Sequence, residues 1–160
     1  MSYTNADGLR VLTNDDQGAL KYQGTMPNGS RQTLVIEIPA FTAIATTFGS
    51  SNIDLNNPVL PANSLILSAT LVMSAAATSS GAATLDIGTY NAAGAALSAT
   101  GIDAAIAITA IDGIGETVRC DGTLTTTGAP ATVDAYIGLK WNAFTYTGGA
   151  GKLYIEYIKL

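Results

Sequence analysis

The chain has 160 residues, carries a formal net charge of −5 at pH 7, and is 48% hydrophobic but only 12% charged. This length suits a single domain that buries about 70% of the surface of its unfolded chain. The seven Lys and Arg residues form no basic stripe, so the composition argues against nucleic acid and membrane surfaces as partners.

Other residue types narrow the range of functions. The chain has no histidine, which removes Ser–His and Cys–His catalysis and the usual zinc sites. Its one cysteine, Cys120, cannot form an internal disulfide and lies in phase with Val118 and Leu124, so we expect it to be buried. We therefore expect the protein not to be an enzyme, with no catalytic residue, no cofactor and no metal ion.

The first segment, residues 1–31, is polar and rich in turn signals such as Asn28-Gly29. Weak strands are predicted at residues 9–13 and 19–23. The start "MSYTNADGLRV" has neither the basic nor the apolar region of a secretion signal, so we expect synthesis in a cytoplasm. The prediction is an N-terminal arm over residues 1–31 and a β-sandwich domain over residues 32–160.

Hydrophobic alternation with a period of two begins at residue 32 and predicts strands. The first, over residues 32–39, places Leu34, Ile36 and Ile38 on one face. Residues 42–64 have no clear period and are interpreted as a weak strand and a long surface loop. Residues 65–77 and 83–90 alternate again, and the short polar link between them predicts a hairpin. The apolar face of the longer of these two strands consists of Leu65, Leu67, Ala69, Leu71 and Met73.

Three further strands are predicted over residues 116–124, 132–141 and 152–160. The apolar face of the second is formed by Val133, Ala135, Ile137, Leu139 and Trp141. The chain thus predicts a mainly β fold, an antiparallel sandwich of about eight strands.

The Ile-rich segment "GIDAAIAITAIDGIG", residues 101–115, interrupts this pattern. Asp103 as an N-terminal cap, Gly113 and Gly115 as terminators and the alanines between them favour one short helix near residues 102–112. A strand with Ile102, Ile106 and Ile108 on one face is the alternative. In either form the isoleucines need cover on more than one side, which predicts an oligomer interface formed by Ile102, Ile106, Ile108 and Ile111.

Three aromatic residues, Trp141, Phe144 and Tyr146, follow one another closely near the C-terminus. They could form a sugar-stacking platform or a rim that contacts a neighbouring protein, because loops of β-sandwiches often carry ligands. The alternative is internal packing, because Trp141 continues the apolar face that begins at Val133.

The run "TGIDAAIAITAIDGIGETVRCDGTL" and the closing "GKLYIEYI" resemble the C-terminal half of small capsid decoration (cement) proteins of tailed bacteriophages, and "NADGLRV" is similar to their starts. The resemblance covers residues 101–160 and, more weakly, the first ten. It implies a jelly-roll-like sandwich on the outer surface of the capsid, a homotrimer that bridges major capsid subunits. A surface with few long charged side chains suits such repeated contacts, because little needs to be desolvated or immobilised.

A second function remains open from the residues. The same sandwich could be a carbohydrate- or receptor-binding module of a phage head or tail fibre, with Trp141, Phe144 and Tyr146 as its site. The cement interpretation instead makes these side chains possible capsid contacts. Both place the protein in a virion assembled in the host cytoplasm.

Overall fold

The computed structural model describes residues 2–4, 10–12, 31–44, 58–128, 130 and 132–160. Strands β1 (Ser2–Thr4) and β2 (Arg10–Leu12) pair with each other antiparallel, with Ser2 opposite Leu12. The strand predicted at residues 9–13 is therefore confirmed, whereas the strand predicted at 19–23 and the turn at Asn28-Gly29 lie outside the described residues. No helix in the described ranges has the length and apolar character needed to cross a membrane.

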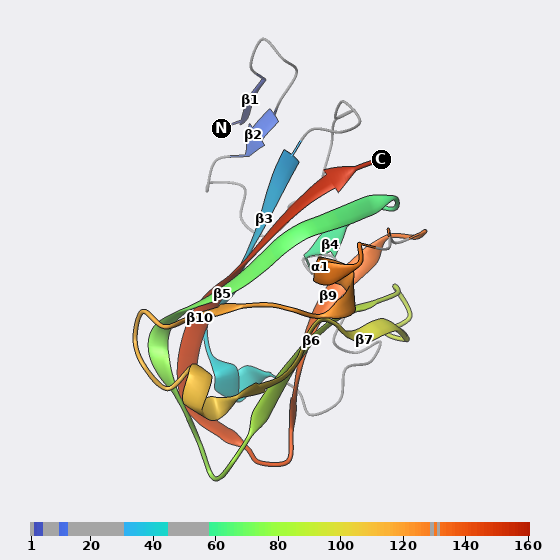
Figure 1. The fold of residues 1–160 in the computed structure, drawn as a ribbon. Helices are drawn as coiled ribbons and strands as arrows, with labels where there is room; N and C mark the ends of the chain where they lie inside the picture. Colours follow the sequence, from blue (N-terminus) through green and yellow to red (C-terminus); the bar gives the residue numbers. More distant parts are fainter. Residues whose placement is uncertain (1, 5–9, 13–30, 45–57, 129, 131) are drawn as a thin grey trace.

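Eight further strands of the described chain form two four-stranded antiparallel sheets (Figure 1). The first sheet has the order β3 (Arg31–Ile38), β10 (Tyr146–Lys159), β5 (Ser64–Ser79), β8 (Thr117–Arg119). The second has the order β4 (Val59–Leu60), β9 (Ala135–Asn142), β6 (Thr84–Tyr90), β7 (Ala96–Ala107). The predicted mainly β sandwich of about eight strands is confirmed.

The order of pairing identifies the sandwich as a jelly roll. β3 pairs with β10, β4 with β9, β5 with β8, and β6 with β7, so the first half of the chain pairs with the second half in reverse order. This is a long antiparallel ribbon that has been rolled up, and the pairs β5–β10 and β6–β9 join its turns into two sheets.

The hairpin predicted between residues 65–77 and 83–90 is wrong. β5 and β6 lie in different sheets, and the link between them carries the chain from one layer to the other. β6 instead forms a hairpin with β7, in which the Asn91 side chain accepts hydrogen bonds from the N–H groups of Ala93 and Ala95 at 2.9 and 3.0 Å. A short polar link is compatible with both arrangements, so the choice is made by the distant strands that occupy the two sides of β5.

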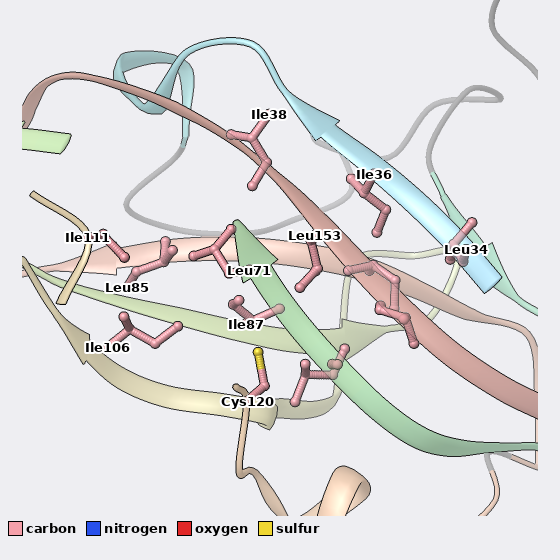
Figure 2. Close-up of a cluster of buried hydrophobic side chains, with 14 of the residues drawn as sticks. Leu34, Ile36, Ile38, Leu71, Leu85, Ile87, Ile106, Ile111, Cys120 and Leu153 are labelled. Atoms are coloured by element: carbon pink, nitrogen blue, oxygen red, sulfur yellow. The ribbon is translucent and has the colours of Figure 1, made fainter. Parts of the chain in front are cut away.

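The core lies between the two sheets and is formed by their inward-facing side chains (Figure 2). β3 contributes the three residues expected of it, Leu34, Ile36 and Ile38. In β5 the expected phase holds for Ala69, Leu71 and Met73 but fails at the start of the strand, where Ser64 and Ile66 are buried in place of Leu65 and Leu67. The cause is an irregularity in the pairing with β10 between Glu156 and Tyr157, which skips one residue of β5.

The helix predicted near residues 102–112 is wrong, and the strand alternative is right for most of the segment. β7 continues to Ala107 and is followed by a one-turn 3-10 helix, η3 (Ile108–Ala110). The short α-helix is α1 (Thr123–Thr126), and a second 3-10 helix, η1 (Phe41–Ala43), follows β3. Pairing of β7 with β6 overrides the helix propensity of its alanines, because burial and sheet hydrogen bonds outweigh differences of under about 1 kcal/mol per residue.

A single chain already covers the Ile-rich segment. Ile102, Ile106 and Ile111 are buried in the core, and Ile108 is partly buried against it. The reason for assigning these four side chains to an oligomer interface is therefore removed: their neighbours are β5, β6 and the rest of the same sandwich. Ile114, in the loop after η3, is 78% exposed.

Matched substitutions separate a core residue from an interface residue. Ile102→Ala should lower the free energy of unfolding by about 2–5 kcal/mol, because it leaves a cavity in the core. Ile114→Ala should change it by less than about 0.5 kcal/mol. Urea denaturation at several protein concentrations measures both free energies. If the destabilisation caused by Ile102→Ala depended on protein concentration, Ile102 would lie in an interface between copies.

Candidate functional site

The three aromatic residues predicted as a possible contact site do not form a common exposed platform. Tyr146, at the start of β10, is only 1% exposed, and its ring packs edge-to-face on Phe41 and Trp141 at centroid distances of 5.5 and 6.3 Å. Burial raises the pKa of Tyr146 to about 12, so its hydroxyl stays protonated. Tyr146 is therefore a core residue and cannot stack on a sugar.

Trp141 and Phe144 differ in their access to solvent. Trp141 is partly buried against the core, and its indole N–H donates to the backbone carbonyl of Ile44. Phe144 is 45% exposed, and its ring lies over Gly81, where any Cβ would come within 2.6 Å of the ring. Of the three, Phe144 is the side chain that a partner can reach most easily.

The carboxylate of Asp86 is buried, and its hydrogen bonds hold the backbone of β7 in place. One oxygen accepts from the Ala105 N–H at 2.9 Å, and the other accepts from the Asn142 side chain at 2.7 Å with Lys140 Nζ at 3.7 Å. Ala105 has a positive φ of 56° and lies where the pairing of β7 with β6 is irregular. Asp86 therefore fixes a β-bulge in β7, which is a structural task.

Asp103 and Cys120 form a second buried polar pair, which connects β7 to the segment after β8. The Cys120 thiol donates a hydrogen bond to the Asp103 carboxylate, and both side chains are buried. Burial, with the nearby charge of Asp103, raises the pKa of the Cys120 thiol to about 12. Since the thiolate is the nucleophile, this cysteine is inert at neutral pH, and the expectation that Cys120 is buried is confirmed.

A pocket of about 240 Å³ opens between the start of β7, α1 and the segment before β9. Its walls combine the aliphatic side chains of Leu97, Leu124 and Val133 with the hydroxyls of Thr89 and Ser98. The described residues that line it include no ionisable side chain. It can accept a small apolar or hydroxyl-bearing group, and it offers no acid, base or charged anchor.

The outer face of the β3–β10–β5–β8 sheet is the candidate interaction surface. Val35 on β3 and Tyr154 on the neighbouring β10 lie opposite each other and are 42% and 37% exposed. Two ion pairs connect β3 with β10 on this face: Arg31–Glu156 at 3.8 Å and Glu37–Lys152 at 4.0 Å. Sequence reasoning missed this surface, although apolar Val35 between Thr33 and Glu37 on the outward side of a strand was a usable signal.

In the part of the chain that the structure describes, no group of three or more His, Cys, Asp or Glu side chains is arranged to hold a metal ion.

No protein-family model matches the chain, and no curated protein matches it. Solved structures do share its fold. A chain in the capsid of Ralstonia phage GP4 superposes with a TM-score of 0.57 at 19% identity, covering 84% of this chain and 87% of that one. A chain in the Cyanophage Pam1 capsid asymmetric unit gives a TM-score of 0.52 at 22% identity, covering 92% and 98%.

A third match is a chain in the acidic stable capsid structure of Helicobacter pylori bacteriophage KHP30. It gives a TM-score of 0.51 at 10% identity and covers 81% of this chain and 93% of that one. At these identities the likeness establishes a common fold. That fold occurs in chains of three phage capsid structures.

The buried carboxyl of Asp103 generates a pH prediction. Burial raises its pKa above the ordinary 3.8, although hydrogen bonds from Ala104 and Cys120 act in the opposite direction. A raised pKa in the folded state means that the contribution of Asp103 to stability is fully present below pH 3.8 and is lost as pH rises through the higher value. Asp103→Asn removes this titration.

Melting temperatures between pH 4 and pH 7 test it, with exposed Asp112→Asn as the matched control. Relative to the wild type, Asp103→Asn should gain stability as pH rises through this range, whereas Asp112→Asn should follow the wild type. Parallel curves for all three proteins would contradict the prediction.

Proposed function

We propose that the protein is a virion structural protein of a tailed bacteriophage: a capsid decoration (cement) protein that binds the outer surface of the assembled capsid. In this role it acts as a homotrimer, bridges neighbouring major capsid subunits and catalyses no reaction. The observation that carries the proposal is the jelly roll shared with chains of three phage capsid structures over 81–92% of this chain. The sequence resemblance to decoration proteins supports the same role.

The surface suits a structural role. Only 12% of the residues are charged, so few ionic groups need to be desolvated when copies pack against a shell. The outer face of the first sheet exposes the apolar side chains of Val35 and Tyr154, and Phe144 is exposed elsewhere on the surface. The ion pairs Arg31–Glu156 and Glu37–Lys152 are exposed to solvent, so each contributes little to stability. Binding should be mostly apolar and backbone-mediated, with a weak dependence on salt.

The structure offers less support to a carbohydrate- or receptor-binding module. Of the three aromatic residues of its proposed site, Tyr146 is buried in the core, and the indole N–H of Trp141 already donates a hydrogen bond to the Ile44 carbonyl. Glycan binding by the isolated chain that is lost in Phe144→Ala, with an unchanged melting temperature, would favour that module over the proposed function.

Stabilisation of the particle is the direct test. A protein that binds the assembled lattice but not free subunits adds its binding free energy to the assembled state alone. Particles that carry the protein should therefore release their DNA at a higher temperature than particles that lack it. Equal release temperatures at demonstrated full occupancy would overturn the cement function.

Binding specificity gives an independent measurement. The purified protein should bind assembled empty capsids saturably and should not bind unassembled capsid subunits. Deleting residues 1–30 tests whether the N-terminal arm takes part: we expect a folded sandwich with reduced capsid binding. If the truncated chain bound capsids as tightly as the full chain, the capsid contact would lie in the sandwich alone.

A further inference from the structure

Two links between strands lie side by side at one end of the sandwich, and both carry the chain from one sheet to the other. One link joins β5 to β6, and the other joins β9 to β10. They lie at the end of β10 that is opposite to the C-terminus (Figure 1). Residues 78–82 and 142–147, which form these links and the strand ends beside them, are called the tip below.

Hydrogen bonds fasten the two links of the tip to each other. The Ser80 N–H donates to the Thr145 carbonyl at 2.9 Å, and the Thr145 N–H donates to Ser80 Oγ at 3.3 Å. Beside this pair, the hydroxyl of Thr147 donates to that of Thr78 at 2.9 Å. Because the links are joined to each other as well as to four strands, the tip keeps one arrangement before a partner binds, and less entropy is lost on binding.

Phe144 is the large apolar side chain that the tip exposes. It is 45% exposed, and its ring occupies the space that a Cβ on Gly81 would need. The residue before it, Ala143, has a φ of 70°, a left-handed conformation that is unfavourable for a residue with a Cβ. Unfavourable backbone conformations of this kind cluster at binding sites. The glycine on one side and the turn on the other thus hold an aromatic ring in a fixed position at the surface.

The tip and the strand ends beside it contain no charged side chain. Residues 74–85 and 142–151 include no Asp, Glu, Lys or Arg. The other exposed side chains of the tip are short, namely Thr78, Ser80, Ala82, Ala143, Thr145 and Thr147. A partner that packs on the tip therefore displaces water from no charged group of this chain. The outer face of the first sheet differs, because a partner there would have to cover the two ion pairs that connect β3 with β10.

We propose that the tip is the surface with which the protein docks on the capsid shell, and that Phe144 is an aromatic anchor that enters an uncharged, apolar depression of the shell. Rigidly held aromatic side chains among small neutral ones are typical of the few positions that carry most of a binding free energy. The inference rests on the proposed function and adds to it the docking surface and the chemistry of the partner.

Removal and displacement of the ring test the anchor. Phe144→Ala removes the ring, whereas Gly81→Ala keeps it but places a methyl group in its position. Each should raise the dissociation constant for assembled empty capsids of the parent phage about tenfold or more. In the Phe144→Ala background, Gly81→Ala should have no further effect, because the ring that it displaces is absent. The control is Leu160→Ala, which truncates a 53% exposed side chain beyond the other end of β10 and should bind like the wild type.

Two insertions of charge test the neutral character of the contact. Ala82→Lys and Ala82→Glu add opposite charges at an exposed position of the tip. Both should weaken binding, because either charge would lose its water against an apolar surface. An electrostatic contact would instead respond to the two variants with opposite signs. Ala93→Lys and Ala93→Glu are the matched controls in the exposed turn at the other end of β6, and they should leave binding unchanged.

The outcomes separate this inference from the proposed function when binding is measured at a temperature at which every variant is folded. Equal binding by the wild type and all variants of the tip would overturn the docking tip and leave the proposed function standing. A wild type that binds no capsid would overturn both. If only Tyr154→Ala weakened binding, the docking surface would be the outer face of the first sheet, which also overturns the inference.

Discussion

The fold depends on the position of its last strand. β10 lies between β3 and β5 and pairs with both, from Gly151 opposite Ile38 on one side to Lys159 opposite Ser64 on the other. The first sheet therefore cannot close until the C-terminal residues have been added, and all its central contacts join distant parts of the chain. Such long-range pairing makes folding slow compared with that of proteins with local contacts. It also makes the C-terminus part of the core, where Leu153 and Ile155 are fully buried.

The few polar groups inside the sandwich serve this architecture. Asp86 holds the bulge at Ala105, and Asp103 connects β7 with Cys120 after β8. Because buried carboxylates are costly unless they are hydrogen-bonded, both of these are paired with backbone or a neighbouring side chain. The two buried carboxylates thus serve the structure, and the surfaces that the described residues offer for function include the outer face of the first sheet and the neighbourhood of Phe144.

Parts of the candidate site could be predicted from sequence, and others could not. The alternation in residues 32–39 placed Val35 and Glu37 on the outward face of a strand, which the structure confirms. The same reasoning could not separate Phe144 from Tyr146, because residues two apart near a turn can differ completely in exposure: 45% against 1%. It also could not show that β3 lies beside β10, because the strand that pairs with β3 comes from the far end of the chain.

The sequence by itself determined the class of fold: period-two alternation, frequent turn residues and few charges specify a β-sandwich with a buried Cys120. Tertiary structure decided the rest. It made residues 102–107 part of strand β7, because pairing with β6 and burial of Ile102 and Ile106 outweigh the local helix preference of alanine. It also separated β5 from β6 into two sheets, because strand pairing is chosen by the free energy of the whole core, to which a short link contributes little.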